Sequence, residues 1–188
     1  MNRLQQDAVL ATLADQLRRK GSWCGETHLQ KATYFLQELL KVPTGFSFIL
    51  YKHGPFSFDL RDELTAMRAD GLLELRAQWP YGPSLVPTER SVELRERFSK
   101  TVSKYERHID LVAEHLGSEN VAGLEKLATA LYITLEGNLG SVGARAKRIH
   151  SLKLHVSLDE ASKAVQTVDA IARAARGLLS CEASSVGA

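Results

Sequence analysis

The sequence has few cysteines, no long hydrophobic run and no excess of charge of one sign. Its 188 residues contain two cysteines, Cys24 and Cys181, too few for a disulfide framework or a four-ligand zinc site. The longest apolar stretches, such as Phe46 to Tyr51, are far shorter than the roughly 20 residues of a membrane-spanning helix. Residues 1–20 are charged throughout, unlike a signal peptide. These absences predict a cytoplasmic protein with free thiols.

The charges are balanced, with 24 Lys and Arg against 22 Asp and Glu and a formal net charge of +2. A general affinity for polyanions is therefore not expected. One local exception lies between Glu136 and Asp159, where no acidic residue occurs and the basic residues of segment 145–153 gather. Such a segment either binds phosphates weakly or forms a solvated helix face.

The first half of the chain predicts three helices, a strand and a hairpin. Apolar residues at helical spacing predict a helix over 3–20, a second from a Thr27–Gln30 capping box to just before Pro43, and a third over 56–70 that Gly71 ends. Gly45 to Tyr51 predicts a strand, which residues 53–55 break. Residues 72–77 and 84–87, joined by a turn from Pro80 to Pro83, predict a β-hairpin wing. This order predicts a winged-helix-like module over residues 1–90.

The second half predicts helices alone. Thr88 is expected to cap a long helix that reaches His115, and a leucine stripe over 124–135 marks the next helix after a break at 117–120. Residues 137–143 predict a loop, and a Ser157–Glu160 capping box opens a final helix. We expect a mainly α (α+β) fold: a module with a small antiparallel sheet, a helical region 91–179 packed on or extending it, and a disordered tail over 180–188.

Three segments carry a family resemblance: LQKATYFLQ at 29–37, YKHGPFSFDL at 51–60 and GLL at 71–73. They resemble the domain shared by YwgA-type uncharacterised proteins and Panacea-type (SocA-like) antitoxins. LVPTERS at 85–91 and LKLHVS at 152–157 extend the YwgA-type resemblance over most of the chain. The resemblance implies a winged-helix-like fold without catalytic residues that is used for binding. His53 stands where the family usually has tyrosine before Gly-Pro.

The leading hypothesis is a non-catalytic, antitoxin-like or defence-associated module that binds a partner protein. Lys31 and Tyr34 lie one helical turn apart, and a Gly-Pro turn presents neighbouring side chains at the mouth of a groove. The alternative is structural: the turn shapes the entry to the third helix, Lys31 is solvated and Tyr34 belongs to the core. The candidate partner-binding residues are Lys31, Tyr34, Tyr51, His53, Gly54, Pro55 and Phe56.

The rival hypothesis is a nucleic-acid-binding transcriptional regulator that uses the wing and the basic segment. Its third helix carries two arginines against four acidic residues, so phosphates would be repelled by that face overall. The candidate nucleic-acid-binding residues are Arg61, Arg68, Arg76, Arg145, Lys147, Arg148 and Lys153.

Patterns typical of enzymes and metal sites are weak. Gly137, Gly140 and Gly143 follow no strand and precede no Lys-Ser or Lys-Thr pair, so a phosphate-binding loop is not expected. His108 and His115 are seven residues apart, too far for the four-residue spacing of metal-binding helices. We therefore expect no enzymatic activity, no metal and no cofactor.

Overall fold

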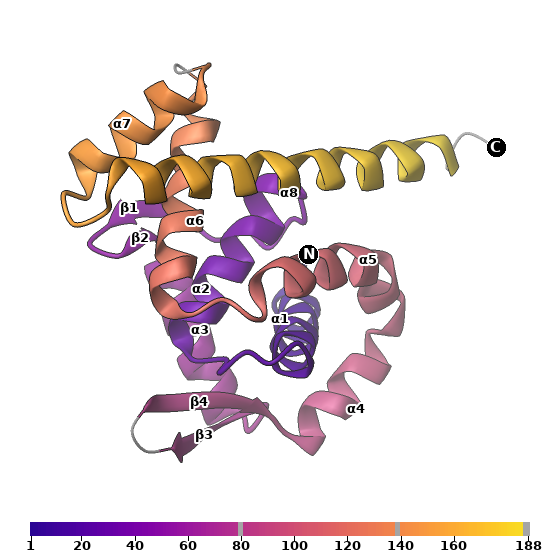
Figure 1. Ribbon diagram of the computed structural model, residues 1–188. Helices are drawn as coiled ribbons and strands as arrows, with labels where there is room; N and C mark the ends of the chain where they lie inside the picture. Colours follow the sequence, from indigo (N-terminus) through magenta and orange to yellow (C-terminus); the bar gives the residue numbers. More distant parts are fainter. Residues whose placement is uncertain (79–80, 138–139, 186–188) are drawn as a thin grey trace.

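The computed structural model describes residues 1–78, 81–137 and 140–185, and in this part of the chain it is mainly helical with two small antiparallel sheets (Figure 1). This confirms the expected fold class. In chain order the elements are α1 (Arg3–Arg19), α2 (Glu26–Tyr34), the π-helical turn η1 (Phe35–Leu39), β1 (Ile49–Tyr51), β2 (Gly54–Phe56), α3 (Phe58–Ala69), β3 (Leu73–Gln78), β4 (Tyr81–Pro87), α4 (Glu89–Arg97), α5 (Ser99–Leu116), α6 (Val121–Leu135), α7 (Val142–Leu152) and α8 (Leu158–Ser185).

The first helix follows its sequence pattern closely. Asn2 and Gln5 form a capping box at its start, and Gly21 lies just past its end at φ +89°. Most of the α1 residues between 7 and 17 are buried, so the helix is surrounded by other elements rather than lying on the surface. The predicted helix over 3–20 is confirmed.

The second helix begins differently from the prediction. Its N-cap is Gly25, no side chain caps it, and the predicted Thr27–Gln30 capping box is wrong. Gln30 is buried and exchanges two hydrogen bonds with the backbone of Ser57: Gln30 Nε2 donates to Ser57 O at 2.8 Å, and Ser57 N donates to Gln30 Oε1 at 2.9 Å. Gln30, which was predicted to cap its own helix, thus links α2 to the start of α3 through long-range hydrogen bonds.

The predicted strand over 45–51 is only partly confirmed. The amide of Gln37 bonds both backbone groups of Phe46, so this part of the segment is held by α2–η1 and not by a strand. Only Ile49–Tyr51 forms a strand, which pairs with β2 in the register Ile49↔Phe56 and Tyr51↔Gly54. Pro55 therefore lies within a strand and does not begin the third helix. The third helix begins at Phe58. Its N-cap is Ser57, whose side chain accepts a hydrogen bond from Leu60 N.

The wing is present as the β3–β4 hairpin, with Leu73↔Pro87 and Leu75↔Leu85 in register. It forms its own sheet, separate from β1–β2. Residues 79–80 of the predicted turn lie outside the described residues. Three helices followed by this hairpin give the order of a winged-helix-like module, with the β1–β2 hairpin inserted before α3.

The predicted long helix over 88–115 is two helices. Thr88 is the N-cap of α4, but its hydroxyl donates to Gly71 O at 2.6 Å instead of capping the helix. A break at Phe98 separates α4 from α5, and the two helices bend around α1 (Figure 1). The Ser157–Glu160 capping box is confirmed by reciprocal hydrogen bonds.

The predicted disordered tail is wrong for residues 180–185, because α8 continues to Ser185. Leu178 is buried, and Glu182 pairs with His108 of α5 at 3.4 Å, so the last turns have tertiary support. Residues 186–188 of the predicted tail lie outside the described residues.

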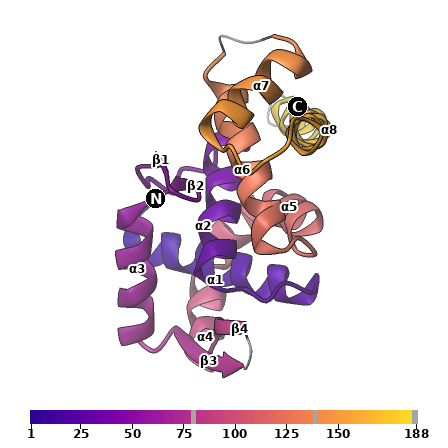
Figure 2. The same cartoon turned by 60° about the vertical axis from the view of Figure 1, so that its left-hand side comes forward.

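A single core joins the two halves of the chain. Helix α1 packs against α5, α2 against α6, and α6 against α7 and α8; Figure 2 shows α8 end-on beside α6 and α7. Cys24 is buried, which raises the pKa of its thiol to about 12, and Cys181 is exposed; both are free. Among the described helices, none has the length and apolar character needed to cross a membrane.

Candidate functional site

The β1–β2 turn is held between α2 and α6 by buried groups. Lys31 of α2 is only 2% exposed, and its Nζ donates a hydrogen bond to Pro55 O at 2.7 Å. Gly54 has φ +83°, and a Cβ atom there would lie 3.0 Å from Thr129 Oγ1 of α6. Glycine is therefore required both by the backbone conformation and by the close approach of the turn to α6.

Glu125 of α6 is the centre of the polar contacts around this turn. Its Oε1 accepts from Lys153 Nζ at 2.7 Å, its Oε2 lies 3.3 Å from His53 Nδ1, and its Oε1 lies 3.9 Å from His155 Nε2. Lys153 also donates to Lys52 O. The side chains of Glu125 and Lys153 are 11% and 8% exposed, so this ion pair is largely removed from water. Lys153, which follows α7, thus holds the β1–β2 turn in place through its contacts with Lys52 O and Glu125.

The surroundings of Lys31 and Glu125 shift the pKa values of both groups. Burial lowers the pKa of Lys31 to about 8, and the charge of Glu125 offsets only part of this effect. Burial would raise the pKa of Glu125, but the hydrogen bond and charge of Lys153, together with His53, outweigh it and lower the pKa. Glu125 is therefore ionised at neutral pH, and Lys31 retains most of its charge.

A cavity of about 360 Å³ lies beside the turn. Its polar lining includes Lys31, Glu125 and His53, and its apolar lining includes Tyr51, Phe56 and Val121. The remaining lining residues are Glu26, Thr27, Gln30 and Gly54. We call this space the turn cavity.

Beside the turn, aromatic side chains are exposed to solvent. Tyr51 is 55% exposed and Phe58 is also exposed, and their ring centroids lie 5.7 Å apart. The Phe56 ring lies 5.1 Å from that of Phe58, and the Arg61 guanidinium lies 5.1 Å from the Phe58 centroid. Ile49, on β1, is exposed as well. We call Ile49, Tyr51, Phe56, Phe58 and Arg61 the aromatic surface.

The seven predicted partner-binding residues divide into two groups. Tyr51 and His53 are exposed, and Phe56 is half-buried. Lys31, Tyr34, Gly54 and Pro55 are buried. Tyr34 packs edge-on against Phe48 with centroids 5.1 Å apart, and burial raises the pKa of its hydroxyl. The four buried residues build the turn and the core, and the expectation that Lys31 is solvated is wrong.

The seven candidate nucleic-acid-binding residues do not form one surface. Arg145 of α7 is buried in a two-bond ion pair with Asp169 at 2.7 and 2.8 Å, and Lys153 is buried against Glu125. Arg61 and Arg76 pair with Asp62 and Glu74. Arg68, Lys147 and Arg148 are exposed. Helix α7 and the β3–β4 wing lie at opposite ends of the molecule in both Figure 1 and Figure 2.

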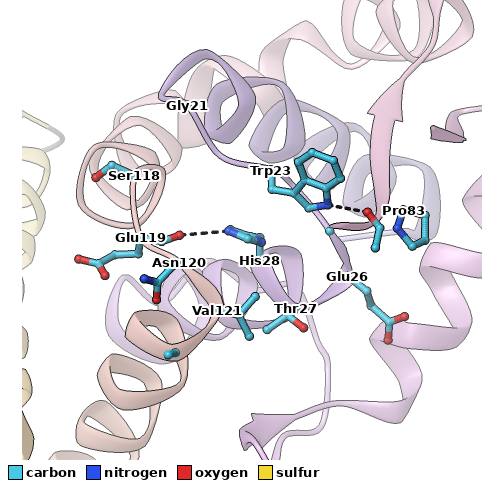
Figure 3. Close-up of a pocket in the computed structure, with 13 residues that line it drawn as sticks. Gly21, Trp23, Glu26, Thr27, His28, Pro83, Ser118, Glu119, Asn120 and Val121 are labelled. Atoms are coloured by element: carbon cyan, nitrogen blue, oxygen red, sulfur yellow. Dashed lines mark hydrogen bonds between the residues drawn. The ribbon is translucent and has the colours of Figure 1, made fainter. Parts of the chain in front are cut away.

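A second, larger cavity of about 770 Å³ lies between the start of α2, the wing and residues 118–122 (Figure 3). Trp23 Nε1 donates to Gly82 O at 2.8 Å, and His28 Nε2 lies 3.2 Å from Glu119 O. Burial lowers the pKa of His28, so the ring is neutral and its Nε2 donates to this carbonyl. The carboxylates of Glu26 and Glu119 lie on opposite sides of the cavity in Figure 3.

Sequence reasoning missed Glu125 and this larger cavity. The signal for Glu125 is a single acid inside the apolar stripe of α6, between Leu124 and Leu127. No local pattern marks the cavity, because its walls come from segments about 60 to 90 residues apart, as the Trp23–Gly82 and His28–Glu119 contacts show.

No protein-family model matches the sequence, and no curated protein matches it either. In the part of the chain that the structure describes, no three His, Cys, Asp or Glu side chains are placed to hold a metal ion.

Proposed function

We propose that this chain is a cytoplasmic, non-catalytic protein-interaction module, antitoxin-like or defence-associated, that binds a partner protein through the aromatic surface. The observation that carries the proposal is the exposure of Tyr51 and Phe58 beside Ile49 and the stacked Arg61. Contiguous exposed apolar groups mark interaction sites, and tyrosine, other aromatics and arginine are enriched in the parts of interfaces that contribute most to affinity.

The rigid support beneath this surface favours the same function. Lys31 holds Pro55 from inside, and the Glu125–Lys153 pair holds His53 and Lys52 from the side. A surface already fixed in one conformation loses little entropy on binding. The polar groups that the sequence predicts in a binding groove would thus act on the partner indirectly, by fixing the turn.

The experiment first identifies the partner and then measures its affinity. A photo-crosslinking amino acid at position 51, expressed in the native host, should capture a partner that the same amino acid at exposed Leu154 does not capture. The purified partner should bind the unmodified chain, and Tyr51→Ala combined with Phe58→Ala should weaken the complex at least about tenfold, with Leu154→Ala as the matched control. Equal weakening by the control, or no crosslink specific to position 51, would overturn the proposal.

The nucleic-acid alternative is favoured by one observation. Arg61 and Arg68 line a small groove against Leu75, Pro83 and Leu85 of the wing. This alternative requires duplex binding that weakens steeply with salt and that Arg68→Glu abolishes. We expect no such binding at physiological salt, because acidic residues accompany both arginines on α3.

A further inference from the structure

The turn cavity contains a buried cation that the protein satisfies only in part. An ammonium group has three N–H donors. Among the described residues, Lys31 Nζ has one hydrogen-bond acceptor, Pro55 O at 2.7 Å, and no carboxylate within 4.0 Å. Burying a charge without a partner is costly, so this position favours an additional acceptor.

The acidic residues of the cavity lining do not supply that acceptor. Glu125 is already paired with Lys153 at 2.7 Å and lies 3.3 Å from His53. Glu26 also lines the cavity, but it is exposed to solvent on the first turn of α2. Among the described residues, Lys31 is therefore a buried cation of the lining without a carboxylate in direct contact.

The other walls suit an apolar group. Tyr51, Phe56 and Val121 present aromatic and aliphatic side chains to the same space as Lys31. A volume of about 360 Å³ lies within the range of about 300 to 1,000 Å³ that is typical of small-molecule sites.

We propose that the turn cavity binds a small organic acid, with its carboxylate accepting a hydrogen bond from Lys31 Nζ and its apolar body lying against Tyr51, Phe56 and Val121. A carboxylate completes the hydrogen bonding of the buried ammonium, and such charge-assisted hydrogen bonds are strong away from water. This site needs no partner protein, so it goes beyond the proposed function and can be tested without it.

The first test uses phenylacetate as the probe and phenylacetamide as its neutral counterpart. Binding is followed by NMR of protein labelled with ¹³C-lysine. Phenylacetate should shift the Lys31 signals, and phenylacetamide should bind at least about tenfold more weakly because it lacks the charge. Acetate should also bind more weakly, because it lacks the apolar body. Equal affinity for the acid and the amide, or no binding of phenylacetate at millimolar concentration, would overturn the proposal.

The second test uses variants. Lys31→Met should remove phenylacetate binding. Val121→Trp should remove it independently by filling the cavity from an exposed position if Lys31→Met does not fold. Val121 also lines the larger cavity, so the shift of the Lys31 signals in the unmodified chain assigns the lost binding to the turn cavity. Leu154→Trp is the matched control, because Leu154 is exposed and lies outside the cavity lining. Undiminished binding in Lys31→Met or Val121→Trp would contradict the site.

The protonation of Lys31 gives a third measurement. Its pKa is lowered to about 8 by burial, and a bound carboxylate should raise it. Glu26→Gln should strengthen phenylacetate binding, because it removes a negative charge from the same lining. An unchanged Lys31 pKa in the presence of saturating phenylacetate would place the acid elsewhere and overturn the proposal.

Discussion

The coupling free energy between Glu125 and Lys153, which are buried, should be far larger than that of an exposed ion pair with the same N–O distance. Glu125→Gln removes the charge that neutralises Lys153, whose side chain is only 8% exposed. Breaking a buried ion pair on one side typically costs about 3 to 5 kcal/mol, because a charge is left unpaired away from water. We expect about 3 kcal/mol here, since Lys153 keeps its hydrogen bond to Lys52 O.

The chain contains a matched control for this experiment. Asp159 and Lys163 of α8 also approach to 2.7 Å, but their side chains are 73% and 72% exposed. Exposed pairs of this kind contribute about 0.3 to 0.5 kcal/mol. The two pairs share the same N–O distance but differ in burial, and the exposed pair is also an i,i+4 pair within one helix, so it serves as the solvent-exposed reference.

The assay is a double-mutant cycle for each pair. Urea unfolding, followed by circular dichroism at neutral pH, is measured for the two single variants and the double variant. Glu125→Gln with Lys153→Met should show a coupling of about 2 kcal/mol, and Asp159→Asn with Lys163→Met a much smaller one. The pKa of Glu125 is lowered, so its contribution should be present at neutral pH and lost as the pH falls through the folded-state pKa. Equal coupling in the two pairs would refute the reasoning.

Gly54→Ala should lower the free energy of unfolding by about 1 to 3 kcal/mol, because it introduces a side chain at φ +83° against Thr129; an unchanged urea midpoint would contradict this. Burial raises the pKa of Asp7 from 3.8 to about 7, so its ionisation should destabilise the fold as the pH rises between these values. Asp7→Asn should therefore raise the melting temperature above neutral pH and lose this advantage near pH 4, and an advantage that is the same at every pH would exclude this cause. Arg145→Glu should destabilise the fold by about 3 kcal/mol or more, because it places a second negative charge against Asp169 in a buried position, whereas exposed Lys147→Glu should change the urea midpoint little.

The sequence predicted most of the helices because their signals are local. The apolar stripe of 3–20, the glycine after α3 and the Ser157–Glu160 capping box each act within a few residues, and each has its expected place in the structure. The errors arise where a side chain that was predicted to cap its own helix instead forms a hydrogen bond with a residue distant in the sequence. Gln30 bonds Ser57 instead of capping its own helix, and Thr88 bonds Gly71.

The sequence patterns group the segments of the candidate site but do not give the roles of its residues. The segments around Lys31 and His53 do meet at one turn. Sequence spacing cannot show that Lys31 faces inward, since α2 is buried almost all round and has no solvated face to orient it. Nor can sequence spacing show that Lys153, which belongs to a basic run, supports the turn by donating a hydrogen bond to Lys52 O, 101 residues earlier in the chain. Helical periodicity describes one element, whereas these contacts depend on how elements pack.

The contacts that fix the His53 turn also determine when it can form during synthesis. Glu125, which contacts His53, follows it in the sequence by 72 residues. Lys153, which donates to Lys52 O, follows Lys52 by 101 residues. A chain emerging from the ribosome presents the wing and α3 well before either partner exists, and contacts of this sequence separation form late because of the entropy of closing long loops. The aromatic side chains beside the turn are thus presented on a fixed backbone only after α6 and α7 have docked. The recognition that we propose through them would therefore require α6 and α7 to be in place.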